Sequence, residues 1–379
     1  MKELSKLKKL FIFSSVHNWN DTRIFYKEAV SLAKKYEVEL HAPADFSFRE
    51  VKGIKIYGLP QWEKRLTRIK TVFILFYRAL KSNADVFHFH DPELIFVGIW
   101  IKVVKRKKVI YDIHENIVKQ IISKEYLSSI SKILFSTLYY FIEKIVIPFV
   151  DVFIIAEDSY NYLYPSTKAI AVHNFPICIN IENKTPKQNK IVYVGNWIQK
   201  ERGVMELLQT IKILKNNGFN IELHIIGKIF RNSNLEDTLN NFIKENKLAN
   251  QIIFYGWLDY YKLFSLIEGA IAGIVCLHPI KNFVNSYPTK IFEYMLCSVP
   301  VIASNFPLWR KIVETNDCGI CVNPLKPKEM SHAIEFLINN PNVAQRMGRN
   351  GRKAVEKHYN WKIEEKKLFV LYQEILEES

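Results

Sequence analysis

Asn285-Ser-Tyr-Pro-Thr-Lys-Ile-Phe-Glu-Tyr-Met-Leu-Cys-Ser-Val-Pro-Val-Ile-Ala-Ser304 is the stretch that decides the fold of this chain. Ser286 and Pro288 are typical of a helix start, and the apolar residues after them recur at helical spacing. Val299 to Ala303 is short, apolar and rich in β-branched residues, as is usual for a strand buried in a parallel sheet. A helix that leads directly into such a strand predicts an α/β fold.

Three polar side chains of this segment, Ser286, Lys290 and Glu293, share one face of the predicted helix. The free N–H groups at the helix start and the Lys290 ammonium suit a phosphate, and the Glu293 carboxylate can accept hydrogen bonds from ribose hydroxyls. The sequence therefore predicts part of a nucleotide site, to which we also assign Asn285 and Thr289. The alternative is an ordinary amphipathic helix with a Lys290–Glu293 surface pair.

Strand and helix patterns alternate along the chain in two series, separated by the polar segment Glu182 to Asn189. The first series predicts strands at Leu10–Ser14, Glu37–His41, Ile54–Tyr57, Val86–His90, Val109–Ile113, Val152–Ala156 and Ala169–His173, with helices such as Arg23–Lys35 and Leu66–Lys81. The second series predicts strands at Ile191–Val194, Ile221–Ile226, Ile252–Tyr255, Ile271–Leu277, Val299–Ala303 and Gly319–Val322. We expect two Rossmann-like domains whose parallel sheets face a central cleft.

A second set of polar residues follows the first strand of the second series. Gly195 and Asn196 end that strand, and Lys200 and Arg202 precede the next predicted helix. A cation gains nothing from a helix N-terminus unless an anion lies there, so Arg202 indicates a phosphate site. The alternative is a solvated cation. Three residues that end neighbouring strands at the same edge are expected to complete the site: Lys228, Gly256 and Trp257.

Histidine and carboxylate clusters end two neighbouring strands of the first series. The first is His90-Asp91-Pro92-Glu93, and the second is Asp112-Ile-His114-Glu115. Such residues could bind a metal ion or contact a polar substrate. Asp91 precedes a proline, as a helix N-cap does. The chain has no Asp-x-Asp motif, so no metal is expected at the predicted phosphate site.

The first βα turn, Ser14 to Ile24, contains no glycine. Dinucleotide-dependent oxidoreductases carry G-x-G-x-x-G at this position, so the turn argues against a nicotinamide enzyme. Asp21 can cap the helix that follows, and Arg23 is expected to reach either the donor phosphates or an anionic acceptor.

Composition sets wider limits. The chain has 379 residues, of which 49% are hydrophobic. This length and composition are enough for two domains, each with its own hydrophobic core. Its net charge of +15 suits diphosphates and anionic lipids, whereas the basic residues are scattered and no nucleic-acid motif occurs. Neither a signal peptide nor a spanning helix is predicted, so we expect a cytoplasmic protein. Two basic, apolar segments, Gln61–Tyr77 and Ile117–Phe149, favour contact with an anionic membrane surface.

The segment Asn285–Ser304, the Arg202 turn and the patterns His-Asp-Pro-Glu and Tyr-Asp-x-His-Glu together resemble family 4 glycosyltransferases, in particular a branch of bacterial surface-polysaccharide enzymes. The resemblance implies the GT-B fold. Residues 1–176 would be an N-terminal, acceptor-side domain and residues 177–189 a linker. Residues 190–358 would be the C-terminal nucleotide-sugar domain, and residues 359–379 a helix that packs back on the N-terminal domain.

The resemblance also implies roles for single residues. Arg202 matches the lysine that grips the donor diphosphate, with Lys200 or Lys228 as a second cation, and His114 matches a histidine that contacts the donor sugar. Glu293 matches the second glutamate of the family's Glu-x7-Glu motif. At two positions the chain departs from the family: Asn285 replaces the first glutamate, and Asn196 replaces a frequent arginine. The acceptor side would comprise Arg23, His90, Asp112 and Glu115.

The implied activity is retaining, metal-independent transfer of a hexose from a UDP- or GDP-linked donor to a saccharide acceptor that is lipid-linked, without a cofactor. Synthesis of capsule, O-antigen lipopolysaccharide or exopolysaccharide would be the setting. The alternative is a catalytically inactive, glycosyltransferase-like partner subunit, which Asn285, Asn196 and the absence of the family's Gly-Gly from the first turn all favour.

Overall fold

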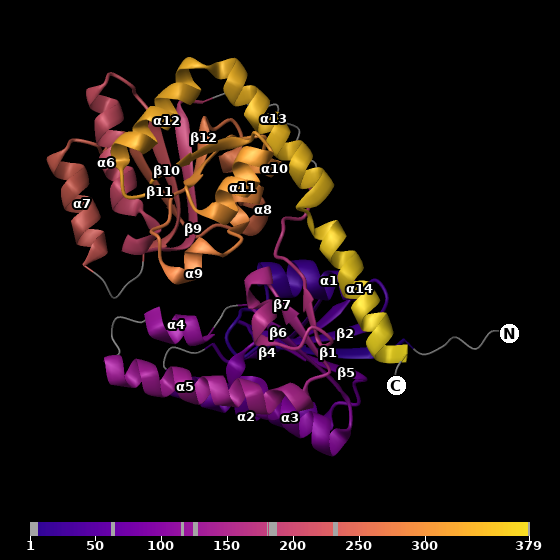
Figure 1. The fold of residues 1–379 in the computed structure, drawn as a ribbon. Helices are drawn as coiled ribbons and strands as arrows, with labels where there is room; N and C mark the ends of the chain where they lie inside the picture. Colours follow the sequence, from indigo (N-terminus) through magenta and orange to yellow (C-terminus); the bar gives the residue numbers. More distant parts are fainter. Residues whose placement is uncertain are drawn as a thin grey trace. The chain divides into compact units, whose positions relative to one another are not determined.

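The computed structural model describes residues 7–61, 65–114, 117–123, 128–179, 181, 188–229 and 234–377 (Figure 1). The chain divides into two compact units, one of Met1–Asn174 with Trp361–Ser379 and one of Phe175–Asn360. The predicted class, α/β with two parallel-sheet Rossmann-like domains, is confirmed. Most of the predicted linker, including residues 182–187, lies outside the described residues, whereas Ile181 is buried in the second unit.

The N-terminal unit contains an eight-stranded sheet with the order β3-β4-β2-β1-β5-β6-β7-β8. Its strands are β1 (Lys9–Phe13), β2 (Glu37–Pro43), β3 (Phe48–Val51), β4 (Ile54–Leu59), β5 (Val86–Phe89), β6 (Lys108–Ile113), β7 (Val152–Ile155) and β8 (Ala169–Ala171). The sequence did not predict β3, which pairs antiparallel with β4 at the sheet edge. The turn between them has positive φ at both Lys52 (54°) and Gly53 (75°), the geometry of a tight hairpin.

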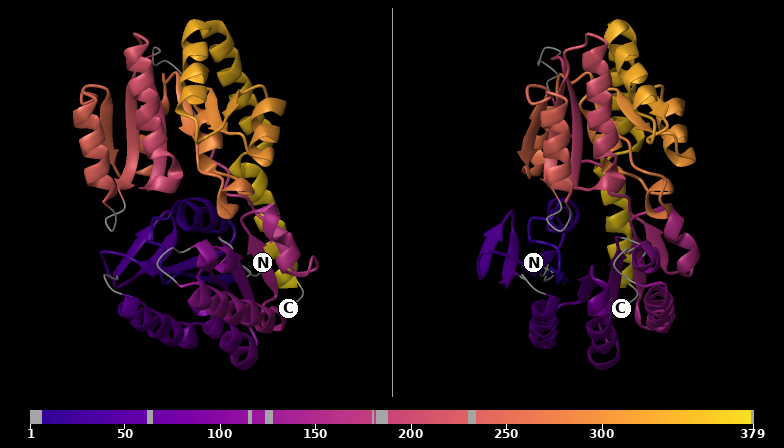
Figure 2. Two further views of the ribbon diagram at one scale, coloured as in Figure 1. Left: turned by 60° about the vertical axis from the view of Figure 1, so that its left-hand side comes forward. Right: turned by 90° about the vertical axis from the view of Figure 1, so that its left-hand side faces the viewer.

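Helices cover this sheet, and Figures 1 and 2 show α2, α3 and α5 on one face of it. The helical segments are η1 (Thr22–Ala29), α1 (Val30–Leu32), α2 (Arg65–Lys81), η2 (Pro92–Leu94), α3 (Ile95–Trp100), η3 (Ile101–Lys105), α4 (Ile117–Ser123), α5 (Ser129–Val146), η4 (Ile147–Phe149), η5 (Asp158–Leu163) and α14 (Trp361–Glu377). The last helix, α14, joins this unit through a hydrogen bond of 2.9 Å from Trp361 Nε1 to Ser31 Oγ. No helix in the described ranges has the length and apolar character needed to cross a membrane.

The C-terminal unit contains a six-stranded, fully parallel sheet with the order β11-β10-β9-β12-β13-β14. The strands are β9 (Lys190–Ile198), β10 (Glu222–Ile229), β11 (Ile252–Gly256), β12 (Ala272–Val275), β13 (Val301–Ser304) and β14 (Gly319–Val322). The helices are η6 (Lys200–Arg202), α6 (Val204–Asn216), α7 (Leu235–Glu245), α8 (Tyr260–Ile267), α9 (Lys281–Val284), α10 (Thr289–Leu296), α11 (Pro307–Thr315), α12 (Pro327–Asn339) and α13 (Pro341–His358). In this order, β9 and β12 are neighbours at the topological switch point, where such sheets bind ligands.

Burial on both faces explains why these strands read as continuous apolar runs. In β1, for example, Leu10 to Phe13 are at most 1% exposed. Such strands gain roughly 25 cal/mol for each Å² of apolar surface removed from water, so register and topology follow from the apolar pattern. The polar residues that carry chemistry are thereby confined to the strand ends.

Candidate functional site

The segment after β9 sets the position of Arg202 in the C-terminal unit. Here η6 leads through Gly203, whose φ is +74°, into α6. A Cβ atom at Gly203 would lie 2.1 Å from the carbonyl oxygen of Cys276, so only glycine allows this close approach to the end of β12. Arg202 is thereby held directly before the N-terminus of α6, at the switch point of the sheet.

Arg202 is half-buried, and its guanidinium lies over the Phe283 ring, 5.5 Å from the ring centre. Its Nε is buried and donates no hydrogen bond within the described part of the chain. A buried donor without an acceptor costs about 1–3 kcal/mol, which an anionic ligand oxygen would recover. This geometry suits a phosphate better than the alternative of a solvated cation.

Helix α10 positions the second charged group of this unit. Tyr294 packs against Gly273, where an added Cβ would lie 2.1 Å from the ring, and this packing fixes the helix against β12. Glu293 is 4% exposed, and its Oε2 lies 3.2 Å from Lys290 Nζ but accepts no hydrogen bond from any described residue. The Lys290–Glu293 pair therefore exists, but the carboxylate is buried and not on the surface as the alternative assumed.

The start of α10 differs from the prediction. The helix begins at Thr289, with Pro288 before it, and Ser286 lies outside it. The Ser286 hydroxyl donates to the Phe283 carbonyl at 3.0 Å, so it closes the preceding turn instead of capping the helix. Asn285 lies in the same turn and is exposed.

Other predicted donor-binding residues lie along the carboxyl edge of the same sheet. Lys228 Nζ lies 6.0 Å from the centre of the Trp257 ring, which is half exposed, and Trp257 directly follows β11. Gly195 and Gly227 pack closely, since a Cβ at Gly227 would lie 2.0 Å from the Gly195 carbonyl oxygen. Two further residues of the predicted set are exposed at this edge: Asn196 and Lys200.

In the N-terminal unit, Arg23 does not have the role predicted for it. This residue is 3% exposed, and its Nε and Nη2 donate to the Asp112 carboxylate at 2.9 and 3.0 Å. Nη1 donates to the Val172 carbonyl at 2.8 Å, and Nε lies 2.9 Å from Glu28 Oε1. Because protein atoms occupy all three nitrogens of the guanidinium, Arg23 does not reach the donor phosphates or an anionic acceptor.

His90 and Asp112 are also interior residues. Their side chains are fully buried, and His90 Nδ1 lies 3.1 Å from His114 Nε2. Burial lowers the pKa of His90 to about 4, so the ring is neutral at pH 7. Burial opposes ionisation of Asp112, but the charges of Arg23 and His114 outweigh it and hold its pKa well below the usual range. Of the predicted acceptor-side residues, Glu115 lies outside the described ranges.

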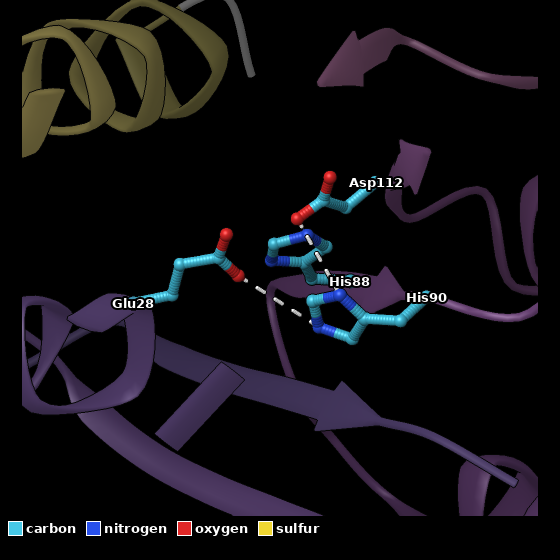
Figure 3. Close-up of side chains that lie close together, drawn as sticks. All are labelled: Glu28, His88, His90 and Asp112. Carbon is cyan, nitrogen blue, oxygen red and sulfur yellow. Dashed lines mark ion pairs between the residues drawn. The ribbon is translucent and has the colours of Figure 1, made fainter. Parts of the chain in front are cut away.

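Glu28 and His88 lie close to His90 and Asp112, and neither was predicted from the sequence to be a site residue (Figure 3). His88 could have been found, since it lies two positions before His90 on one strand and therefore on the same face. Glu28 could not, because Arg23 and Glu28 share a face only in the wide π-helical turn η1, which the sequence pattern does not indicate. Burial and the nearby Asp112 charge raise the pKa of Glu28 well above its usual range.

Asp91 has a different role from the predicted helix cap. Its side chain does not cap η2, and its Oδ2 accepts hydrogen bonds from Ser14 Oγ at 2.7 Å and from Ser15 N at 2.6 Å. The first βα turn thus binds an internal carboxylate where a dinucleotide enzyme would bind phosphate, which agrees with its lack of glycine. The predicted Asp21 cap is confirmed, since Asp21 Oδ1 accepts from the Arg23 and Ile24 amides at 2.8 and 3.0 Å.

Comparison with known proteins gives one matching family and several relatives. Residues 176–354 match the family model of the glycosyl transferases group 1. The chain is 26% identical over 196 residues to the capsular polysaccharide biosynthesis glycosyltransferase CapM of Staphylococcus aureus, which covers 50% of this chain and 47% of CapM. The chain thus spans about half the length of that relative. An uncharacterized glycosyltransferase of Methanocaldococcus jannaschii is 21% identical over 363 residues, covering 89% of this chain and 90% of the relative.

Solved structures match over the whole chain. The sucrose-phosphate synthase of Thermosynechococcus elongatus has a TM-score of 0.75 at 16% identity and covers 98% of this chain and 100% of its own. Anabaena HepE in complex with UDP-glucose has a TM-score of 0.70 at 14% identity, with 97% and 100% covered. At these identities the likeness shows the fold alone. The chain therefore has the fold of the GT-B glycosyltransferases, and its residues 176–354 match the model of the glycosyl transferases group 1.

Proposed function

We propose that this protein transfers a sugar from a nucleotide-sugar donor to a saccharide acceptor. The observation that carries the proposal is the buried, unpartnered Nε of Arg202 directly before α6. The N-terminus of α6 and the guanidinium together present positive charge at one point, as a diphosphate requires. The matched family region, residues 176–354, contains this point and supports the assignment.

In the proposed reaction the C-terminal unit binds the donor. Arg202 contacts the diphosphate and stabilises the negative charge that grows on it as the sugar–phosphate bond breaks, with Lys200 or Lys228 as the second cation. Glu293 accepts hydrogen bonds from the ribose hydroxyls, and Trp257 contacts the base. HepE is described in complex with UDP-glucose, so UDP and UDP-sugars are the first ligands to test.

The N-terminal unit contributes His114 in this proposal. Its side chain is 17% exposed, and its Nε2 lies 3.4 Å from Asp112 Oδ2. Because His90, Asp112 and Arg23 are buried, they act behind His114 by fixing its orientation and do not contact the acceptor. We propose that His114 contacts the transferred sugar and that the sugar keeps its anomeric configuration, with the leaving phosphate taking the acceptor proton.

We further propose that the donor reacts without a bound metal. In the part of the chain that the structure describes, the cluster of histidines and carboxylates suited to a metal belongs to the N-terminal unit, whereas Arg202 belongs to the C-terminal unit. Cationic side chains then neutralise the leaving group directly. Adding Mg²⁺ or Mn²⁺ to the protein as purified should leave the rate within about twofold, a change well below the several kcal/mol that a metal contributes where it does take part.

The surface of the N-terminal unit supports a lipid-linked acceptor. Helix α2 has no acidic residue, and its Lys70 and Lys81 are exposed. Large apolar side chains of α2 and α5 are exposed, among them Phe73 (68%), Ile130 (80%), Ile133 (67%), Leu134 (62%), Phe141 (58%) and Ile145 (61%). Cations beside apolar side chains suit an anionic bilayer surface, and we propose that this face binds the membrane that carries the acceptor.

Two observations support a proposal for the acceptor class: this surface, and the similarity to CapM, whose name places it in capsular polysaccharide biosynthesis. We propose a growing surface polysaccharide of the capsule, O-antigen or exopolysaccharide type. A second candidate is a catalytically inactive partner subunit, which the exposed Asn285 favours because an amide replaces a carboxylate at that position.

A two-stage experiment tests the proposal and separates the two candidates. A thermal-shift panel of UDP, GDP and their sugars should raise Tm for one nucleotide series in the wild type and by much less in Arg202→Gln. The selected nucleotide sugar should then be hydrolysed slowly or transferred by the purified protein. Binding without turnover would favour the inactive subunit, and no binding by any nucleotide would contradict both candidates.

A further inference from the structure

Four buried side chains meet inside the N-terminal unit: Glu28, His88, His90 and Asp112 (Figure 3). Each offers one nitrogen or oxygen atom, and these four atoms lie within 4.8 Å of one another. The side chains of Glu28, His90 and Asp112 have no exposed surface, and His88 is 0% exposed. Such a set of polar groups is costly to bury unless each has a partner.

Several of these atoms have no hydrogen-bond partner among the described residues. Both Glu28 oxygens, His88 Nε2 and His90 Nε2 form no hydrogen bond, although Glu28 Oε1 lies 2.9 Å from Arg23 Nε and His90 Nε2 lies 3.9 Å from Glu28 Oε2. Unpaired buried groups of this kind point to a water molecule or an ion between them. Figure 3 shows the four side chains close together, with the Glu28 carboxylate facing His90 Nε2 and the Asp112 carboxylate facing His90 Nδ1.

In each imidazole, Nδ1 has a contact outside the four side chains, and Nε2 has no hydrogen bond to a described residue. His88 Nδ1 lies 2.8 Å from the Tyr372 hydroxyl of α14, and His90 Nδ1 lies 3.1 Å from His114 Nε2. Asp112 is held by the two hydrogen bonds from Arg23 and still has lone pairs available. Metal-binding histidines and carboxylates are oriented by a second ring of hydrogen bonds in this way.

The charges of the cluster also favour a cation. With Glu28 and Asp112 both ionised, two negative charges lie beside the single positive charge of Arg23. One proton on Glu28 would balance the remaining charge, but it would give partners to at most two of the four unpaired atoms. A divalent cation would contact Glu28, His88 and His90 at once, with Asp112 as the fourth ligand.

We propose that Glu28, His88, His90 and Asp112 bind one first-row divalent transition-metal ion, with Zn²⁺ as the best match. Two imidazole nitrogens and two carboxylate oxygens are ligands that Zn²⁺ accepts in a four-coordinate site. Metal–ligand bonds of about 2.1 Å place the four ligand atoms of a tetrahedral site about 3.4 Å apart. Binding of the ion therefore brings the two most distant ligand atoms closer together by about an ångström or more. The ion ties η1 to β5 and β6, and its role is structural.

The test uses the full-length, tag-free chain and two matched variants. Glu28→Gln keeps the shape of the side chain and removes a charged ligand. Glu143→Gln is the control, because Glu143 is also a buried carboxylate of this unit but binds the Tyr164 hydroxyl at 2.7 Å, outside the cluster. Zinc content is measured by elemental analysis, and the chelated proteins are titrated with Zn²⁺ and with Co²⁺, whose visible absorption reports its ligands.

We expect about one Zn²⁺ for each wild-type and Glu143→Gln chain after reconstitution, and an affinity at least about tenfold lower in Glu28→Gln. Zn²⁺ should raise the Tm of chelated wild type and control, and much less that of Glu28→Gln. If Glu28→Gln does not fold, the visible spectrum of Co²⁺ bound to the wild type tests the site instead. A spectrum typical of nitrogen and oxygen ligands at low coordination number would support the proposed ligands. Less than stoichiometric Zn²⁺ in the wild type, or equal binding by wild type and Glu28→Gln, would overturn the proposal.

Discussion

Arg23 and Arg202 occupy similar places in the two units, each beside the helix that follows the first strand of its sheet, yet their surroundings are opposite. Arg23 is 3% exposed, and its guanidinium donates to Asp112 and to the Val172 carbonyl. Arg202 has a buried Nε that donates to no described atom. A buried arginine whose three nitrogens all have internal partners stabilises the fold, whereas one with a buried, unused donor is available to a ligand.

The largest effect should come from exchanging the two arginines for glutamine one at a time. Arg23→Gln leaves Asp112 and Glu28 buried without their cation and should lower the free energy of unfolding by about 3–5 kcal/mol. Arg202→Gln removes no ion pair with a described residue and should change this free energy by less than about 1 kcal/mol. Urea denaturation of both variants measures the difference, and equal losses of stability would remove the contrast between the two units.

The second effect concerns turnover. Arg202→Gln should reduce kcat for the selected nucleotide sugar by on the order of 10²-fold or more, because leaving-group charge is greatest in the transition state. Arg202→Lys should recover part of the rate, since a single charge replaces the two-pronged guanidinium. Steady-state kinetics of the three proteins provide the measurement. A rate within a factor of two of wild type in Arg202→Gln would remove Arg202 from the mechanism.

Glu293→Gln should act mainly on binding. Loss of a charged hydrogen bond to the ribose costs about 1.5–3 kcal/mol, or roughly 10- to 150-fold in Kd for the nucleotide. Calorimetric titration of the nucleoside diphosphate measures Kd in the wild type and the variant. Glu314→Gln serves as control, because Glu314 is an exposed carboxylate on α11 that pairs only with Arg310 among the described residues. Equal Kd values for Glu293→Gln and the wild type would contradict the ribose contact.

His173, a buried histidine of the N-terminal unit, should make the stability of the protein depend on pH. His173 Nε2 lies 3.2 Å from Asp158 and Nδ1 lies 3.5 Å from Glu364 of α14. Burial opposes its charge, but both carboxylates outweigh burial and raise its pKa from 6.5 to about 9. A raised folded-state pKa contributes stability that is complete below pH 6.5 and disappears as the pH rises through 9. The Tm of the wild type should therefore fall over this range relative to His173→Gln, and parallel Tm curves would show that the ion pair contributes nothing.

The smallest effect is expected at the membrane surface. Each cation near an anionic bilayer contributes about 1 kcal/mol, so binding through α2 should be weak and reversed by salt. Flotation with anionic vesicles at low and high salt tests this, with Lys70→Glu and Phe73→Ser combined as the variant. A protein that stays in the soluble fraction at low salt would leave a soluble saccharide as the better acceptor.

Most of the fold was predictable from sequence because the strands are buried on both faces and read as short apolar runs. Strand β3 was not, since Phe48 to Val51 is exposed or half-buried and its tight turn uses Lys52-Gly53 in place of the common Asn-Gly. The doubly wound topology then followed from the alternation of strands and helices, and the strand ends placed the polar residues at the sheet edge.

The candidate site was predictable only in part. The sequence indicated that Arg202, Lys290 and Glu293 share a sheet edge, because residues at the carboxyl ends of parallel strands meet there. It could not show that Arg23 is turned inward, since its partners Asp112 and Val172 are distant in the chain. It also could not show that Asp91 binds the first turn, because a proline after an aspartate favours the helix-cap interpretation equally well.

The most direct test of the donor site is a calorimetric titration of UDP, GDP and their sugars into the wild type, Arg202→Gln and Arg23→Lys. We predict that one nucleotide series binds the wild type, that Arg202→Gln weakens this binding by at least about tenfold, which corresponds to 1.4 kcal/mol, and that folded Arg23→Lys leaves it unchanged. Two results would contradict the assignment of the donor site to Arg202 and its neighbours in the C-terminal unit. The first is unchanged binding by Arg202→Gln, and the second is loss of binding in a folded Arg23→Lys.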